Sequence, residues 1–199
     1  LSLAPVSDMT EGTQEFYQTC SALAKNGNGL AGWYLTHAKL GSSDILLTQK
    51  FLFLCNPDSI KITEPGKVLG NSSIIPEVGW GALRTGWGTT DSVLGLISDN
   101  SSMGHNHFDQ NSFLLATNGT WIADDPGYST FVSTEQARQQ FRGKVGHNTI
   151  LVNWEKNTDN GAQVFKGGGS LTPNILTSSY GYLIGSAEDS YGLDVLKQF

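Results

Sequence analysis

Residues 112–123, SFLLATNGTWIA, predict a β-hairpin. Ser112 to Thr117 and Thr120 to Ala123 are short runs in which apolar, β-branched and aromatic residues predominate. Asn118-Gly119 stands between them, and this pair is a strong two-residue turn signal because both residues tolerate a positive φ. The hairpin predicts antiparallel β-structure in this part of the chain.

Other short β-prone runs lie on both sides of this hairpin, each bounded by Gly, Asn, Asp or Pro. They are Ala82 to Trp87, Ser92 to Ser98, Thr149 to Asn153, Gln163 to Phe165 and Tyr180 to Ala187. The 24 glycines among 199 residues also indicate many turns. Such spacing predicts a mainly β fold, with antiparallel sheets packed as a β-sandwich.

The first part of the chain has a helical pattern instead. Apolar residues recur at steps of three and four over residues 11–25, and similar patterns cover 30–40 and 44–54. Between residues 57 and 78 the pattern stops, and three prolines accompany several Gly and Ser residues. We therefore predict a helical segment at 1–56, a linker at 57–78 and a β-sandwich domain at 79–199.

Composition excludes some classes of function. The 38% of hydrophobic and 15% of charged residues are typical of a folded protein. A net charge of -6 with no run of Lys or Arg argues against nucleic acid as a partner. No stretch approaches the roughly 20 apolar residues of a membrane span. Cys20 and Cys55 have no metal-ligand spacing, so they are either free thiols or one disulfide.

Three of the four histidines, His105, His107 and His147, stand in polar settings rich in Gly and Asn. Imidazole and carboxylate are the usual zinc ligands, and His107, Asp125 and His147 would supply three of them. Strands must bring these residues together, because they are far apart in the sequence. The alternative is three unrelated polar residues at strand ends. Asp124 competes with Asp125, which we prefer because it directly precedes Pro126-Gly127.

The chain resembles the heparinase II/III-like polysaccharide lyases in three motifs that follow one another in the same order. They are an H-x-H-x-D-x-x-S-F stretch at 105–113, a D-x-G turn at 125–127 and an H-N-T strand start at 147–149. The resemblance covers about residues 79–153. It implies a large antiparallel β domain after an α/α toroid, of which the helical segment would be the end.

The resemblance also implies roles for individual residues. Zinc would be bound by His107, Asp125 and His147, while His105 would face the glycan as the base or as the donor that neutralises its carboxylate. Independently of the resemblance, Arg142 stands five residues before His147 and could bind a substrate carboxylate as a bidentate fork, or be a structural Arg. Tyr128 could line the cleft or fill a turn. His37, in the helical part, matches no catalytic motif.

The leading hypothesis is a polysaccharide lyase that cleaves a uronic-acid glycan by β-elimination, with a structural zinc and a secreted or periplasmic location. The partners would be an acidic polysaccharide and an N-terminal toroid domain that completes the active site. One rival is a non-catalytic glycan-binding or structural glycoprotein on the same scaffold. Another is a hydrolase that uses zinc-bound water.

Overall fold

The computed structural model describes residues 15–37, 60–101, 107–127, 134, 144–152, 163–172 and 175–191. These residues fall into two compact units, divided between Gly70 and Asn71. The division lies inside the predicted linker, 57–78, and the domain limits taken from the sequence stay predictions. Neither described helix has the length and hydropathy that a membrane span requires.

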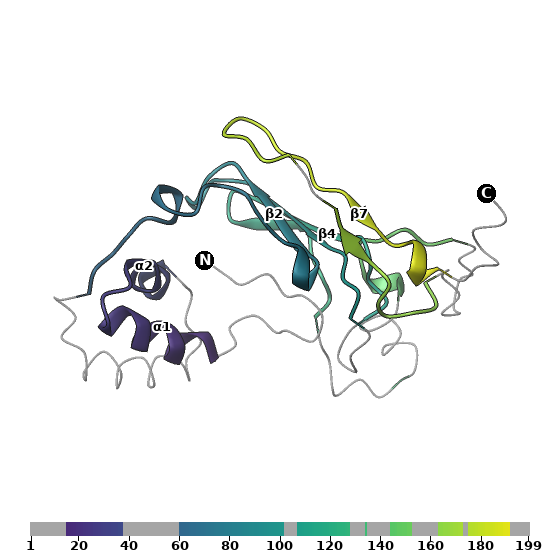
Figure 1. Cartoon of the computed structure of the whole chain (residues 1–199), viewed down its shortest axis with the longest axis horizontal. Coiled ribbons are helices and arrows are strands. Elements are labelled where there is room, and N and C mark those ends of the chain that lie inside the picture. The colour runs from purple at the N-terminus through teal and green to yellow at the C-terminus, as the bar shows by residue number, and fades with distance from the viewer. Residues whose placement is uncertain are drawn as a thin grey trace. The chain divides into compact units, whose positions relative to one another are not determined.

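The first unit contains two α-helices, α1 (Glu15–Lys25) and α2 (Gly29–His37), followed by a short 3₁₀ helix, η2 (Pro65–Lys67) (Figure 1). Gly27 has a φ of 85° and ends α1 in the left-handed conformation. The Asn28 side chain then caps α2, since its Oδ1 accepts the Ala31 N–H at 3.0 Å. The predicted helices at 11–25 and 30–40 are confirmed where described; the one at 44–54 lies outside the described residues.

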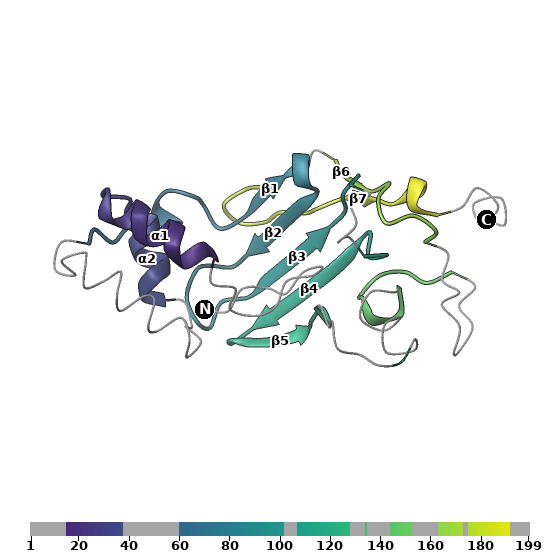
Figure 2. The same ribbon diagram turned by 90° about the horizontal axis from the view of Figure 1, so that it is seen from below.

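The second unit is built on a five-stranded antiparallel sheet in the order β1-β2-β3-β4-β5 (Figure 2). Its strands are β1 (Ser73–Ile75), β2 (Trp80–Arg84), β3 (Val93–Ile97), β4 (Ser112–Thr117) and β5 (Thr120–Ala123). A short 3₁₀ helix, η3 (Pro76–Val78), joins β1 to β2. The sheet is a meander, so neighbours in sequence are neighbours in space.

The predicted hairpin is confirmed as β4 and β5. Asn118 and Gly119 have φ values of 49° and 72°, the positive values that a tight hairpin turn needs. On one face of the sheet, Ile97 and Leu114 are buried and Trp121 packs against them. Because β4 and β5 are antiparallel, the residues before β4 and after β5 lie at the same end of the sheet.

A second, two-stranded sheet consists of β6 (Ser170–Leu171) and β7 (Gly185–Ser186). Their connection runs along the sheet and is drawn in yellow-green in Figure 1. It packs on the face opposite Ile97, since Leu171 and Leu183 lie over Gly81, and Ser98 Oγ donates to the Ser186 carbonyl at 2.7 Å. The predicted fold class, mainly antiparallel β preceded by a few helices, is confirmed.

Some predicted strands differ from the structure. Residues 149–152 contain no strand, and Gln163 makes only an isolated bridge to Tyr191. The reason is that the side chains of Thr149 and Gln163, rather than a backbone ladder, supply the hydrogen bonds there. Conversely, β1 lies in the predicted linker, because its apolar run of two residues is too short to stand out among the neighbouring Gly, Ser and Pro residues. Two further 3₁₀ helices are η4 (Lys144–Gly146) and η5 (Glu188–Ser190).

Candidate metal centre

His107 and Asp109 lie just before β4, and both are buried, with 1% and 3% of their surface exposed. A tight turn leads from them into the strand: the Ser112 N–H donates to the Asp109 carbonyl at 2.9 Å, and Asn111 has a φ of 60°. Asn is among the few residues that adopt this left-handed conformation at low cost. The turn therefore sets where the Asp109 carboxylate stands relative to the sheet.

Asp125 follows β5 and is also buried. Its Oδ1 accepts the Gly127 N–H at 2.8 Å, which makes a local turn through Pro126. Gly127 has a φ of 65°, a conformation that a residue with a Cβ adopts only with strain. The D-P-G sequence thus orients the carboxylate, and leaves its second oxygen free to face the next element.

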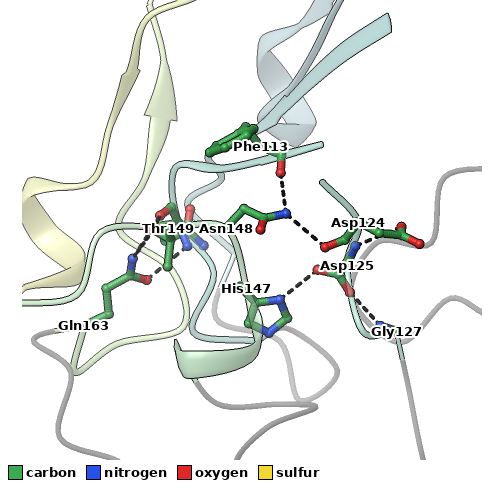
Figure 3. Close-up of polar contacts among 9 residues, drawn as sticks. Phe113, Asp124, Asp125, Gly127, His147, Asn148, Thr149 and Gln163 are labelled. Carbon is green, nitrogen blue, oxygen red and sulfur yellow. Dashed lines mark hydrogen bonds and ion pairs between the residues drawn. The ribbon is translucent and has the colours of Figure 1, made fainter. Parts of the chain in front are cut away.

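His147 comes directly after η4 and completes the group (Figure 3). Its Nδ1 lies 2.7 Å from Asp125 Oδ2, and both side chains are fully buried. The His147 ring also stands beside the His107 ring, with centroids 5.2 Å apart and planes tilted by 41°. Residues from three separate segments therefore meet at one end of the five-stranded sheet.

This group could hold a metal ion. One ligand atom from each of His107, Asp109 and His147 lies within 4.8 Å of the others. The Nε2 atom of His147 is buried and has no hydrogen-bond partner among the described residues, which is costly unless something binds it. Imidazole nitrogens with a carboxylate suit a divalent transition metal such as zinc, so these residues fit the zinc ion that the sequence resemblance implies.

The electrostatics of Asp109 also favour a cation. Burial raises the pKa of its carboxyl from 3.8 to about 6, partly opposed by the charge of His147 and reinforced by the charges of Asp125 and Asp99. Burial is the largest cause. A bound cation would reverse this balance, because it stabilises the ionised carboxylate in the same place.

Asn148 braces the segment that carries His147. Its Nδ2 donates to the Phe113 carbonyl in β4 and to the Asp124 carbonyl after β5, both at 2.9 Å (Figure 3). The Phe113 N–H in turn donates to the Asn148 carbonyl at 3.3 Å. The residue next to His147 is therefore tied to the two strands that carry the other members of the centre.

A second brace holds the residue after Asp109. The buried carboxamide of Gln163 accepts the Gln110 N–H at 3.0 Å and donates to the Gln110 carbonyl at 2.9 Å. It also donates to Thr149 Oγ1 at 2.9 Å, which joins the brace to the H-N-T motif. The Gln110 side chain spans the Asp99 N–H and the Lys166 carbonyl, each at 2.7 Å.

The three predicted ligands, His107, Asp125 and His147, all lie in this buried group, and Asp109 is a further member of it. His107 and His147 come together with Asp109, while Asp125 contacts His147 through a hydrogen bond. Asp124 is exposed, and its Oδ1 accepts the Asp125 N–H at 2.9 Å. Sequence reasoning did not consider Asp109 as a ligand, although its position two residues after His107 was a usable signal.

Other predicted residues fall outside this centre. His105, Tyr128, Arg142 and Cys55 lie outside the described residues. His37 is stacked on Trp33 in α2, with ring centroids 4.4 Å apart. Arg84, in β2, lies over the Trp87 ring at 4.5 Å, and burial lowers the pKa of its guanidinium. Cys20 is a free thiol.

Comparison with known proteins agrees with this architecture. A heparinase III solved with methylated lysines superposes with a TM-score of 0.65 and 17% identity, covering 96% of this chain and 26% of its own. A mutant heparan sulfate lyase from Pedobacter heparinus gives 0.64 and 17%, covering 94% and 26%. This chain therefore spans about a quarter of those proteins.

No curated protein sequence matches the chain. The family model described as heparinase II/III-like, C-terminal, matches residues 68–193, which include β1 to β7 and the metal centre. The match extends beyond the three motifs on both sides. The chain belongs to the heparinase II/III-like family and contains its C-terminal domain.

Proposed function

We propose that the protein is a polysaccharide lyase that cleaves a uronic-acid-containing glycan by β-elimination. The observation that carries the proposal is the buried group of His107, Asp109, Asp125 and His147, formed within a domain of the heparinase II/III-like family. Its motif places His105 two residues before a buried member of the group. The fold likeness to heparinase III and heparan sulfate lyase supports the same reaction class.

β-Elimination makes three demands on a protein. A base must remove the proton beside the sugar carboxylate, a donor must neutralise that carboxylate, and an acid must protonate the leaving oxygen. We propose His105 as the base or the neutralising donor. Arg142 is proposed to bind the carboxylate as a bidentate fork, and Tyr128 to line the cleft.

We propose that zinc is the metal and that His107, Asp125 and His147 bind it. Zinc would supply structural cross-linking here, joining the segment before β4, the turn after β5 and the segment after η4. The burial of all three residues supports this role. By fixing His107, the centre would also fix the direction from which His105 meets the glycan.

The remaining partners follow from the family's architecture. Because the chain spans about a quarter of the two lyases it resembles, we propose that an N-terminal toroid domain supplies the other half of the active site. The substrate would be an acidic polysaccharide, and a secreted or periplasmic location would give access to it. The helical unit of α1 and α2 would be the end of that toroid.

The test is a screen of the protein, expressed with its toroid domain, against heparan sulfate, alginate and other polyuronates. Elimination leaves an unsaturated sugar that absorbs in the near ultraviolet, whereas hydrolysis does not. We expect absorbance to grow with one class of glycan, and His105→Ala to abolish it while zinc content is unchanged. Retained turnover in His105→Ala, or cleavage without the unsaturated product, would refute the proposal.

The alternative is a glycan-binding or structural protein that keeps the centre for stability. The complete burial of Asp125 and His147 favours a structural use of the centre as much as a supporting catalytic one. The same screen separates the two proposals. Glycan binding without any unsaturated product, in protein that contains zinc and the toroid domain, would favour the alternative.

A further inference from the structure

We infer that Arg84, held against Trp87, is a second anion-binding site of the protein, which binds a carboxylate or sulfate group of the glycan away from the metal centre. Arg84 is the last residue of β2, and Trp87 follows it in the loop that leads to β3. The inference rests on the acidic glycan that we propose as the substrate, and it adds a further point of attachment for that glycan.

The site and the metal centre lie at opposite ends of the five-stranded sheet (Figure 2). At one end, Trp80 pairs with Ile97, which pairs with Ser112 at the start of β4, close to the metal centre. At the other end, Arg84 pairs with Val93. The length of β2 between them is about 13 Å at about 3.3 Å per residue step. A glycan chain of several sugars can therefore contact both ends, whereas one sugar unit can contact only one of them.

Arg84 projects from a face of the sheet that an anion can reach. Residues that are opposite in an antiparallel pair, or two apart in one strand, point to the same face. Arg84, opposite Val93, therefore shares its face with Ile97. The connection between β6 and β7 packs on the other face. The Arg84 side chain is only half-buried, which leaves room for a ligand to approach it.

The guanidinium of Arg84 carries a charge that no acid in the described part of the chain neutralises. Its Nη1 is buried without a hydrogen-bond partner, and no ion pair between described residues includes Arg84. Burial lowers the pKa of the guanidinium, so its charged form is under-solvated. The Trp87 ring, 4.5 Å from the guanidinium carbon, offsets only a part of this cost. An anion bound at the open side of the guanidinium would supply the missing opposite charge.

The loop that holds Trp87 is fixed by its own hydrogen bonds. The carboxylate of Asp91 accepts the Gly88 N–H at 2.7 Å and the Thr85 hydroxyl at 3.0 Å. This carboxylate, which stands in the same loop, therefore shapes the loop instead of pairing with Arg84. Since these bonds lie within the protein, Arg84 and Trp87 are oriented before a ligand arrives, and less freedom is lost on binding.

The chemistry of the site suits the charged groups of an acidic glycan. A guanidinium presents its donors in a planar fork that matches two oxygens of one anion, as a carboxylate or a sulfate offers them. The chain has a net charge of -6, so its overall field repels a polyanion. A polyanionic glycan would therefore need local cations along its path, and Arg84 is a cation whose charge is still available.

The experiment measures equilibrium binding by titration calorimetry, with the protein expressed together with its toroid domain. The two probes are oligosaccharides of heparan sulfate and of alginate, which carries carboxylates but no sulfate. Arg84→Met removes the charge and keeps an apolar stem over Trp87. Lys67→Met is the matched control, because it removes the same charge from an exposed residue.

We expect Arg84→Met to weaken binding by about 10- to 100-fold, as the loss of a charge-assisted hydrogen-bonded pair implies. Lys67→Met should bind as the wild type does. A loss with heparan sulfate alone would assign a sulfate to the site, and a loss with both probes would assign a carboxylate. Arg84→Lys keeps the charge without the fork and should also weaken binding.

Thermal unfolding without glycan is the second measurement. Because the half-buried charge of Arg84 is not neutralised, Arg84→Met should melt no lower than the wild type. A lower melting temperature would mean that an acidic side chain of the protein itself pairs with Arg84, and would overturn the inference. Wild-type affinity in both Arg84 variants would overturn it as well and leave the proposed function standing. A wild type that binds neither probe would overturn both.

Discussion

Gln163→Ala is expected to lower the free energy of unfolding by about 3–5 kcal/mol. The Gln163 side chain is 0% exposed and its carboxamide makes four hydrogen bonds, to the Gln110 N–H and carbonyl, Thr149 Oγ1 and the Tyr191 hydroxyl. Truncation leaves the buried Gln110 N–H unsatisfied, at about 1–3 kcal/mol. The other three bonds are to oxygens that each keep another hydrogen bond, so their loss costs less. These bonds and the cavity left by the side chain make up the rest of the expected loss.

The assay is equilibrium unfolding in urea. With a slope of about 2 kcal/mol per molar, a loss of 4 kcal/mol moves the midpoint down by about 2 M. Gln163→Met keeps a side chain of similar length without its polar atoms, so it removes the hydrogen bonds but not the volume. If the bonds carry the effect, Gln163→Met should lose most of what Gln163→Ala loses.

Val164→Ala is the matched control, because Val164 is the next residue and its side chain is 49% exposed. We expect its free energy of unfolding to change by no more than about 0.5 kcal/mol, as is usual for surface substitutions. A Gln163→Ala variant that is no less stable than Val164→Ala would refute the reasoning, because it would mean that the Gln110 backbone finds other partners. A loss in Gln163→Ala but none in Gln163→Met would assign the effect to packing instead.

Three other substitutions test the centre itself. In metal-free protein the folded pKa of Asp109 is about 6 and the unfolded one is 3.8, so the folded state binds a proton more tightly. The free energy of unfolding should therefore fall by about 3 kcal/mol as pH rises from about 4 to above 6, and urea titrations should show no such fall in Asp109→Asn. Gly127→Ala, at a φ of 65°, should cost about 1–2 kcal/mol by thermal unfolding, whereas Gly95→Ala, with no neighbour closer than 3.6 Å to the added Cβ, should cost less than half of that. Asn148→Ala removes the two bonds that tie the residue after His147 to Phe113 in β4 and to Asp124 after β5. It should lower the free energy of unfolding by about 2 kcal/mol and weaken zinc binding, measured by competition with a chelator. Unchanged zinc affinity would show that Asn148 does not position His147.

Much of the sheet could be predicted from local sequence. β4 and β5 have the predicted bounds, because Asn118-Gly119 specifies a turn whose geometry depends only on those two residues. β1 and β6 could not be predicted in this way. They have three and two residues, too few for an alternating pattern, and they pair only because neighbouring strands are already in place.

The metal centre could also be predicted only where the local sequence carries a signal. His107 and His147 stood out because histidines are rare in this chain and these two lie among small polar residues. Gln110 and Gln163 gave no such signal, since a glutamine is usually a surface residue, and only the fold shows that both are 0% exposed. Asp109 was visible in the motif, but its burial and its distance from His147 depend on contacts between separate segments.

The two braces hold the backbone of residues 110–113, which directly follow His107 and Asp109 of the metal centre. Gln163 bonds to the backbone of Gln110, and Asn148 bonds to the carbonyls of Phe113 and Asp124. His107 and Asp109, which belong to the centre, precede Gln110 directly in the chain. Because the braces are hydrogen bonds within the protein, they position the candidate ligands before any ion binds. Little conformational entropy would then be lost when a metal binds. A centre assembled in this way suits a metal that fixes structure, because its ligands are buried and already directed at one another. If the protein is the lyase we propose, a metal bound at this buried centre would act by fixing the strand ends, not as an acid or a base, and the glycan would meet only the residues that it holds in place.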